Sequence, residues 1–187
     1  MRQPGGARHL AAPVAASHAA WTAAVWVYFE RMQLRTEIEI DAPAAVVWEI
    51  LIDGSKYHEW NPFITTLEGE LVEGRHLNVV VSPPDGSDFR FRPRLLRCER
   101  EKELRWRGKV LGEFLFSGEH YFTLEQGQGG RTRLVHGEDF KGLLVRFLGQ
   151  QLTATARGFV FMNQALKRRA EAVVMRADPS IQRNGVG

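Results

Sequence analysis

Strict alternation of polar and apolar residues is the strongest structural signal in this chain. In the segment Arg35–Ile40 the odd positions are charged, while the even positions can face a core. Successive side chains of a β-strand point to opposite faces, so this period of two predicts a strand that is half buried. The same period returns in five later stretches, at residues 77–81, 88–95, 103–110, 113–124 and 131–138, and residues 64–70 are expected to add a further strand. Repeated alternation with glycine-rich breaks indicates an antiparallel sheet.

Helical spacing appears at two places outside these strands. Asp41 and Pro43 are suited to begin a helix, which Asp53 and Gly54 should end, and a short helical turn is expected over residues 55–60. Residues 150–176 carry apolar side chains at steps of three and four, which predicts a long amphipathic helix. The element order predicts an α+β fold, in which an antiparallel sheet of about six or seven strands packs against the long C-terminal helix.

The first 31 residues differ in composition from the rest of the chain. They are rich in alanine, are interrupted by proline and glycine, and end in an apolar stretch at residues 21–29. The longer run from Leu10 to Phe29, which Pro13 and His18 interrupt, is at the lower limit for a membrane span, and no small-residue cleavage site follows it. An extension upstream of a true start at Met32, an extra docked helix and an anchor are the three alternatives. We therefore expect an extension at 1–31, one folded domain at 32–176 and a disordered tail at 177–187.

Composition narrows the class of protein. The chain has 187 residues, of which 44% are hydrophobic and 25% charged, and these values are typical of one globular domain. The net charge is only +3, and the arginines are spread along the strands, so a nucleic-acid partner is not expected. The single cysteine, Cys98, excludes an intramolecular disulfide and a cysteine-rich metal site. A reducing, cytoplasmic location fits this cysteine content.

Several local passages resemble one known superfamily. They are Ile38–Pro43 with Val47–Leu51, then Tyr57–Phe63, and near the other end Gly118–Phe122 and Gly130–Leu144. This text is similar to small bacterial members of the polyketide cyclase/dehydrase and lipid-transport superfamily, also called SRPBCC or START-like. The resemblance spans about Leu34 to Glu171. It implies that residues 32–176 form a ligand-binding domain with a helix-grip fold, in which the curved sheet wraps around the C-terminal helix. Members of the superfamily bind lipids, polyketides, hormones or aromatic compounds, and the resemblance implies no single activity, because only some members are enzymes.

Aromatic residues gather on the inward phase of the predicted strands and helix. If a gap separates the sheet from the helix, they line an apolar cavity suited to a flat ligand, and otherwise they form an ordinary core. The corner at Trp60 and Phe63 and the loop at Phe140 are expected to border the mouth. The other candidate ligand-binding residues of this face are Phe89, Phe91, Trp106, Phe114, Phe116, Phe122, Phe159, Met162 and Asn163.

Three polar residues share the inward face. His120 and His136 lie on adjacent strands with matching parity and are expected to be cross-strand neighbours, and Glu138 lies on the same face. Buried polar groups must be paired, so the three form either a hydrogen-bonded network or a contact for the polar end of a ligand. Their spacing matches no known metal motif, and no metal is expected. Proton transfer by either histidine is conceivable, but the sequence shows no third group that orients the rings.

Three hypotheses of function follow. The leading one is a non-enzymatic binder or carrier of a small hydrophobic ligand, such as a lipid, polyketide or aromatic compound, without a cofactor. The second is a cyclase or dehydratase that uses His120, His136 and Glu138. The third is a protein-interaction module like the chaperone-activating relatives, which predicts a large exposed apolar patch and no cavity. A membrane span is not expected, and a monomer and a homodimer remain alternatives.

Overall fold

The computed structural model describes residues 31–84, 86–110, 116–142 and 149–177. The first half contains β1 (Arg31–Ile40), α1 (Ala44–Ile52), η1 (Gly54–Lys56), α2 (Tyr57–Trp60), β2 (Ile64–Glu68), β3 (Asn78–Val81) and β4 (Phe89–Phe91). The second half contains β5 (Arg94–Glu99), β6 (Glu103–Val110), β7 (Phe116–Gln126), η2 (Gln128–Gly130), β8 (Thr132–Lys141) and α3 (Gly149–Ala177). The expected extension at 1–31 and the expected tail lie almost wholly outside the described residues.

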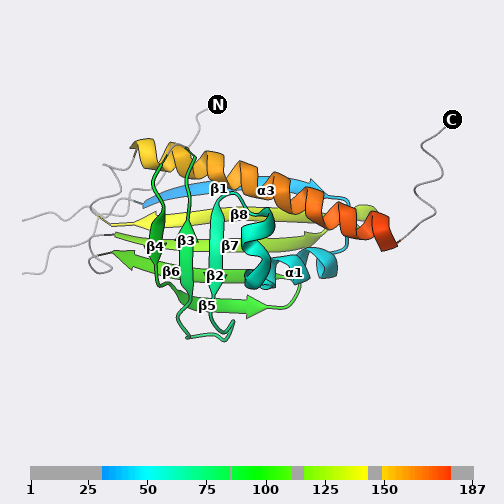
Figure 1. The fold of residues 1–187 in the computed structure, drawn as a ribbon, viewed down its shortest axis with the longest axis horizontal. Coiled ribbons are helices and arrows are strands. Elements are labelled where there is room, and N and C mark those ends of the chain that lie inside the picture. Colours follow the sequence, from blue (N-terminus) through cyan, green and yellow to red (C-terminus); the bar gives the residue numbers. More distant parts are fainter. Residues whose placement is uncertain (1–30, 85, 111–115, 143–148, 178–187) are drawn as a thin grey trace, which may run out of the picture.

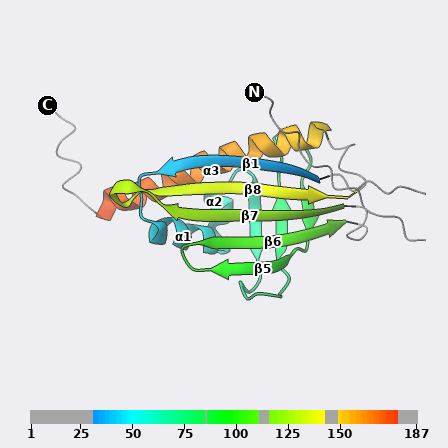
Figure 2. The same ribbon diagram turned by 180° about the vertical axis from the view of Figure 1, so that it is seen from behind.

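The described strands form two antiparallel sheets. The larger has the order β1-β8-β7-β6-β5, and the smaller has the order β2-β3-β4. In Figure 1 the strands of the small sheet run across those of the large one, and α3 extends along the β1 side. Figure 2 shows the five strands of the large sheet side by side from behind, with α3 beyond β1 and β8. This is the α+β helix-grip fold that the element order and the family resemblance predicted.

The division into two sheets departs from the sequence-based prediction at one place. Residues 88–95 alternate like a single strand, but the chain leaves the small sheet after Phe91 and enters the large one at Arg94. Pro93 lies between them and has no N–H group to donate to a strand ladder. Its carbonyl instead accepts a hydrogen bond of 2.9 Å from the backbone N–H of Leu77. Phe89, expected to face inward, is 50% exposed and stacks on Phe91.

The helices agree closely with the prediction. The helix α3 begins one residue before the expected start and ends one residue after the expected end. The helix α1 ends at Asp53 as predicted, but its N-cap is Pro43 and not Asp41. The Asp41 carboxylate instead forms an ion pair of 2.7 Å with Arg131, because Ala42 and Pro43 separate it from the first helical turn.

The middle of α3 packs directly on the inner face of the large sheet. Phe159, Met162, Leu166 and Ala170 are all buried there. A glycine allows one especially close approach, since a Cβ atom on Gly158 would lie 2.1 Å from the ring of Phe63. The rings of Phe63 and Phe159 also meet edge to face, with centroids 5.5 Å apart. The corner that follows α2 is therefore held against the long helix.

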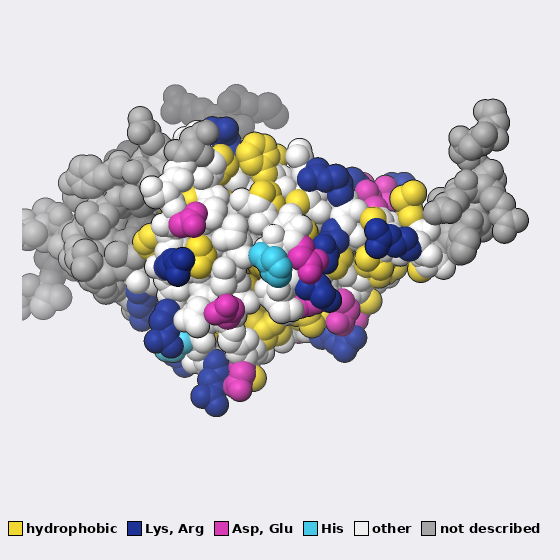
Figure 3. All heavy atoms as spheres, viewed as in Figure 1, with side chains coloured by type: hydrophobic (Ala, Val, Ile, Leu, Met, Phe, Trp, Pro, Cys, Tyr) yellow, Lys and Arg dark blue, Asp and Glu magenta, His cyan; other side chains and the backbone are white. Residues whose placement is uncertain are grey.

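Charged side chains are distributed over the surface in pairs of opposite sign. On the face shown in Figure 3, lysines and arginines are interspersed with acidic residues. Two such pairs belong to α3, where Arg169 contacts Glu59 at 2.7 Å and Lys167 contacts Glu171 at 2.6 Å. In the described part of the chain, no helix has the length and apolar character needed to span a membrane.

Candidate functional site

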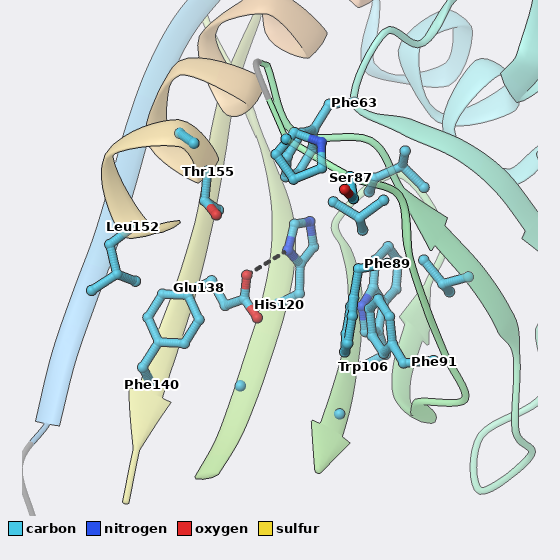
Figure 4. A pocket seen from close by; sticks show the side chains of 18 of the residues that line it. Phe63, Ser87, Phe89, Phe91, Trp106, His120, Glu138, Phe140, Leu152 and Thr155 are labelled. Atoms are coloured by element: carbon cyan, nitrogen blue, oxygen red, sulfur yellow. Dashed lines mark hydrogen bonds and ion pairs between the residues drawn. The ribbon is translucent and has the colours of Figure 1, made fainter. Parts of the chain in front are cut away.

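A cavity of about 570 Å³ lies between the small sheet, the large sheet and the first turns of α3. Its volume is within the range that small-molecule sites commonly have. Figure 4 shows aromatic and aliphatic side chains projecting into it from several elements. Val79 and Val81 of β3 form one wall, and Leu152 and Thr155 of α3 form the opposite one.

The aromatic part of the lining comes from both sheets. The ring of Phe91 lies close to Gly108 of β6, where the absence of a side chain leaves room for it: a Cβ atom at Gly108 would lie 3.2 Å from the ring. Trp106 of β6 stacks on His120 of β7, with centroids 4.8 Å apart and planes 7° from parallel. Phe63 and Phe140 complete the aromatic surface. Such a surface suits a flat, apolar ligand.

A chain of buried polar side chains leads away from the cavity into the core. The Nε2 atoms of His120 and His136 are 3.0 Å apart and share a hydrogen bond. His136 Nδ1 lies 2.8 Å from Oδ1 of Asn163, which belongs to α3. His120 Nδ1 lies 3.4 Å from Oε2 of Glu138, at the wall of the cavity. Figure 4 shows this last contact, with the carboxyl group and the ring facing each other.

The strand register explains how these residues meet. His120 of β7 is directly opposite Glu138 of β8, while His136 is opposite Phe122. The two histidines are therefore diagonal neighbours and not the direct cross-strand pair that parity suggested. The observed register differs from the predicted one by two residues along β8, because residues 127–131 form a five-residue connection between the paired Gln126 and Thr132. The shared face and the contact between the rings follow as expected.

Burial changes the protonation of all three groups. Desolvation lowers the pKa of His120 to about 3. It also lowers the pKa of His136, with a further decrease from the neighbouring His120. The pKa of Glu138 is raised to about 8, first by burial and then by the charge of Asp139. The charged forms are disfavoured because the surroundings offer few dipoles to replace water. Burial therefore favours the neutral forms of both imidazoles and of the carboxyl group.

Asn163, predicted as an inward-facing residue, is the third group that orients the rings, a role that the sequence did not indicate. Oδ1 of Asn163 accepts from His136, and Nδ2 of the same amide donates a hydrogen bond of 2.9 Å to the hydroxyl of Thr36 on β1. That hydroxyl donates to the backbone carbonyl of His136 at 3.1 Å. His136 also stacks on Phe159, with ring centroids 3.8 Å apart. The ring of His136 is thus oriented from two elements that are remote in sequence.

The structure divides the predicted site residues into two groups. The lining of the cavity includes Phe63, Phe89, Phe91, Trp106, His120, Glu138 and Phe140. The core behind it, where α3 sits directly on the sheet, holds Phe122, His136, Phe159, Met162 and Asn163. Trp60 lies at a separate groove between α1, α2 and α3. Phe114 lies outside the described residues, and Phe116 begins β7, but its side chain is not among those described.

Other lining residues were not predicted as part of the site. Val79 and Val81 have the same parity within the strand predicted at 77–81, but only the crossing of the two sheets brings them to the cavity. Leu152, Ala154 and Thr155 of the long helix line it as well. Among the described residues, no group of three histidine, cysteine or acidic side chains is arranged to hold a metal ion.

Comparison with known families decides the relationship. The family model described as polyketide cyclase/dehydrase and lipid transport matches residues 31–171. The chain belongs to this family. No curated protein matches it in sequence.

Solved structures share the fold at low sequence identity. The Zhui aromatase/cyclase from Streptomyces sp. R1128 has a TM-score of 0.64 and 17% identity, over 81% of this chain and 98% of that one. Norcoclaurine synthase from Thalictrum flavum has a TM-score of 0.61 and 13% identity, over 79% and 98%. The di-domain ARO/CYC BexL of the BE-7585A pathway has a TM-score of 0.62 and 15% identity over 75% of this chain, which spans half of its length. At these identities the likeness shows the fold alone.

Proposed function

We propose that this family member binds a flat, mostly apolar molecule in the cavity, with one polar group of the ligand at Glu138. The observation that carries the proposal is the cavity of about 570 Å³ with a largely aromatic and aliphatic lining. An apolar ligand leaves water on entering such a site, which contributes roughly 25 cal/mol per Å² of apolar surface buried. The interaction-module hypothesis predicts a domain without a cavity, so the cavity counts against it.

The position of Glu138 supports an oriented mode of binding. Its side chain is 20% exposed, and its carboxyl group is held at the wall by His120. A buried polar group that is only partly paired favours a ligand that completes its hydrogen bonds. The aromatic members of the lining then determine the plane of the ligand, and the carboxyl group determines which end enters first. Lipid-like and polyketide-like aromatic compounds have this combination of properties.

Binding of a hydrophobic dye tests the proposal. Nile red should bind wild-type protein saturably, and native mass spectrometry should detect one molecule per chain. Ala154→Trp places a large side chain in the cavity and should weaken binding by at least about tenfold. Val160→Trp is the matched control, because Val160 lies on the same helix and is exposed. Failure of the wild type to bind dye, or equal binding by Ala154→Trp, would refute the proposal.

Acid–base catalysis of the cyclase or dehydratase kind is the second candidate. The observation in its favour is the hydrogen-bonded series from Asn163 through both histidines to Glu138, which ends in a carboxyl group with a raised pKa. An acid with a pKa near the working pH is suited to transfer protons. Glu138→Gln keeps the shape and neutral charge but has no transferable acid proton. A catalyst would therefore lose turnover on polyketide-like substrates, whereas a binder would keep its affinity.

A further inference from the structure

The hydrogen bonds around Asn163 have one direction. The single proton of the Thr36 hydroxyl is donated to the carbonyl oxygen of His136, so its oxygen is left to accept from Nδ2 of Asn163. The amide of Asn163 is thereby oriented with its oxygen, Oδ1, toward His136. An amide oxygen only accepts hydrogen bonds. The nitrogen Nδ1 of His136 must therefore carry a proton.

This direction is transmitted through both rings. A neutral imidazole has one N–H group, so Nε2 of His136 is bare and accepts from Nε2 of His120. Nδ1 of His120 is then bare as well, and it faces Oε2 of Glu138. Only a protonated carboxyl group can donate to it. His136 is fully buried and His120 is 5% exposed, with Trp106 stacked on His120 and Phe159 stacked on His136.

The second carboxyl oxygen of Glu138 is left for the ligand. Among the residues that the structure describes, Oε1 has no hydrogen-bond partner, and Glu138 lines the cavity. In Figure 4 this oxygen points away from the contact with His120. Because the acid proton is directed to His120, Oε1 is a carbonyl-type acceptor with no proton of its own to offer. The cavity wall therefore presents an acceptor at this point.

We propose that Thr36 and Asn163 are positioning residues that set the tautomers of His136 and His120, so that Glu138 selects ligands with a hydroxyl or phenolic donor. The inference rests on the proposed function and specifies its ligand class. A ligand with only a carbonyl or ether oxygen at this place would set two acceptors against each other.

The role of Thr36 becomes clear if the direction of these hydrogen bonds is reversed. Burial disfavours the charged pair of a His120 imidazolium and a Glu138 carboxylate. If Glu138 accepted from a neutral His120, Nδ1 of His120 would carry its one proton, and the bare Nε2 would require a proton on Nε2 of His136. Nδ1 of His136 would then be bare and would face Oδ1 of Asn163, which is also an acceptor. Only a rotated amide would resolve this conflict, and rotation breaks the bond from Nδ2 to Thr36. The hydroxyl on β1 therefore opposes reversal at a site two rings away.

Two measurements on the intact chain test the inference at pH 6.5. The first is nitrogen-15 NMR of the histidine side chains, which distinguishes the two tautomers. His136 should be protonated at Nδ1 and His120 at Nε2. The opposite pair of tautomers, or an imidazolium at either position, would overturn the inference whether or not the protein binds a ligand.

The second measurement compares the affinities for 2-naphthol, which has a phenolic hydrogen-bond donor, and 2-methoxynaphthalene, which has only an ether oxygen at the same position. Wild-type protein should bind 2-naphthol roughly three- to tenfold more tightly, as expected for one net hydrogen bond. Equal affinities overturn the inference and leave the proposed function intact, while binding of neither compound refutes both. Thr36→Val should abolish the preference for 2-naphthol with little change in the affinity for the methoxy compound. Thr36→Ser keeps the hydroxyl and should retain the preference. A purely structural role of Thr36 would instead lower both affinities in parallel.

Discussion

Gly118 lies beneath the carboxyl group of Glu138, and a Cβ atom at Gly118 would be 2.3 Å from Oε1. The two residues are on adjacent strands, since Gly118 is paired with Phe140, two positions beyond Glu138. The missing side chain therefore provides the space in which the carboxyl group turns toward His120. A small residue on β7 and an acid on β8 are thus parts of one arrangement.

Gly118→Ala should displace this carboxyl group. We expect a loss of about 1–3 kcal/mol in the free energy of unfolding, the usual cost of an overpacked interior site, together with weaker ligand binding. Urea denaturation measures the first effect. In a Glu138→Ala background the obstructing oxygen is absent, so the same glycine replacement should cost little. An equal cost in both backgrounds would show that Glu138 is not the cause.

The pH dependence of stability should reflect the buried network. The pKa of Glu138 is raised from 4.5 to about 8, so the folded state holds a proton that the unfolded chain releases, and stability falls between pH 4.5 and 8. The pKa of His120 is lowered from 6.5 to about 3, and stability is therefore lost as the pH falls below 6.5. From these two residues, with His136 acting in the same direction as His120, maximal stability is expected near pH 6.5.

Glu138→Gln separates the two limbs of this profile. Glutamine does not titrate, so the variant should lack the decline between pH 6.5 and 8, which amounts to at most about 2 kcal/mol for one proton over 1.5 pH units. Between pH 4.5 and 6.5 the variant should gain stability with pH more steeply than the wild type, because both histidines remain and the opposing titration of Glu138 is absent. Thermal or urea unfolding at several pH values provides the comparison. A wild-type profile that is flat above pH 6.5 would contradict the raised pKa.

Asn163→Leu should destabilise the core. The substitution leaves Nδ1–H of the buried His136 without its acceptor, and an unsatisfied buried donor costs about 1–3 kcal/mol. Gln164→Leu, at the adjacent exposed position of α3, is the control and should change the free energy of unfolding by less than about 0.5 kcal/mol. Comparable unfolding midpoints for the two variants would argue against a stabilising bond between Asn163 and His136.

Gly158→Ala should disturb the junction between α3 and the corner at Phe63. The new Cβ would lie 2.1 Å from the phenyl ring, and the neighbouring contact with Phe159 limits how far that ring can move. We expect a loss of about 3 kcal/mol or slightly more, despite the better helix propensity of alanine. Adding Phe63→Ala should remove the clash, so the penalty for Gly158→Ala should disappear in the double variant. Its persistence there would place the clash elsewhere.

Much of the architecture followed from the sequence by itself. The period of two identified which face of β7 and β8 is buried, and therefore that His120, His136 and Glu138 share a face. The step of three and four located α3 to within one residue at each end. These features are local, because side-chain direction in a strand or helix depends only on position along the element.

Only the tertiary structure decided how these faces meet. The pairing of His120 with Glu138, in place of His136, depends on the five residues between β7 and β8. The contact of Asn163 with His136 depends on the rotation of α3 about its axis. The break at Pro93 depends on the presence of two sheets, since the residues before it pair in the small sheet and those after it pair in the large one. The cavity is the clearest case. Alternation shows that Phe91 and Trp106 point inward, but the distance between α3 and the crossed sheets determines whether they enclose a space or fill it.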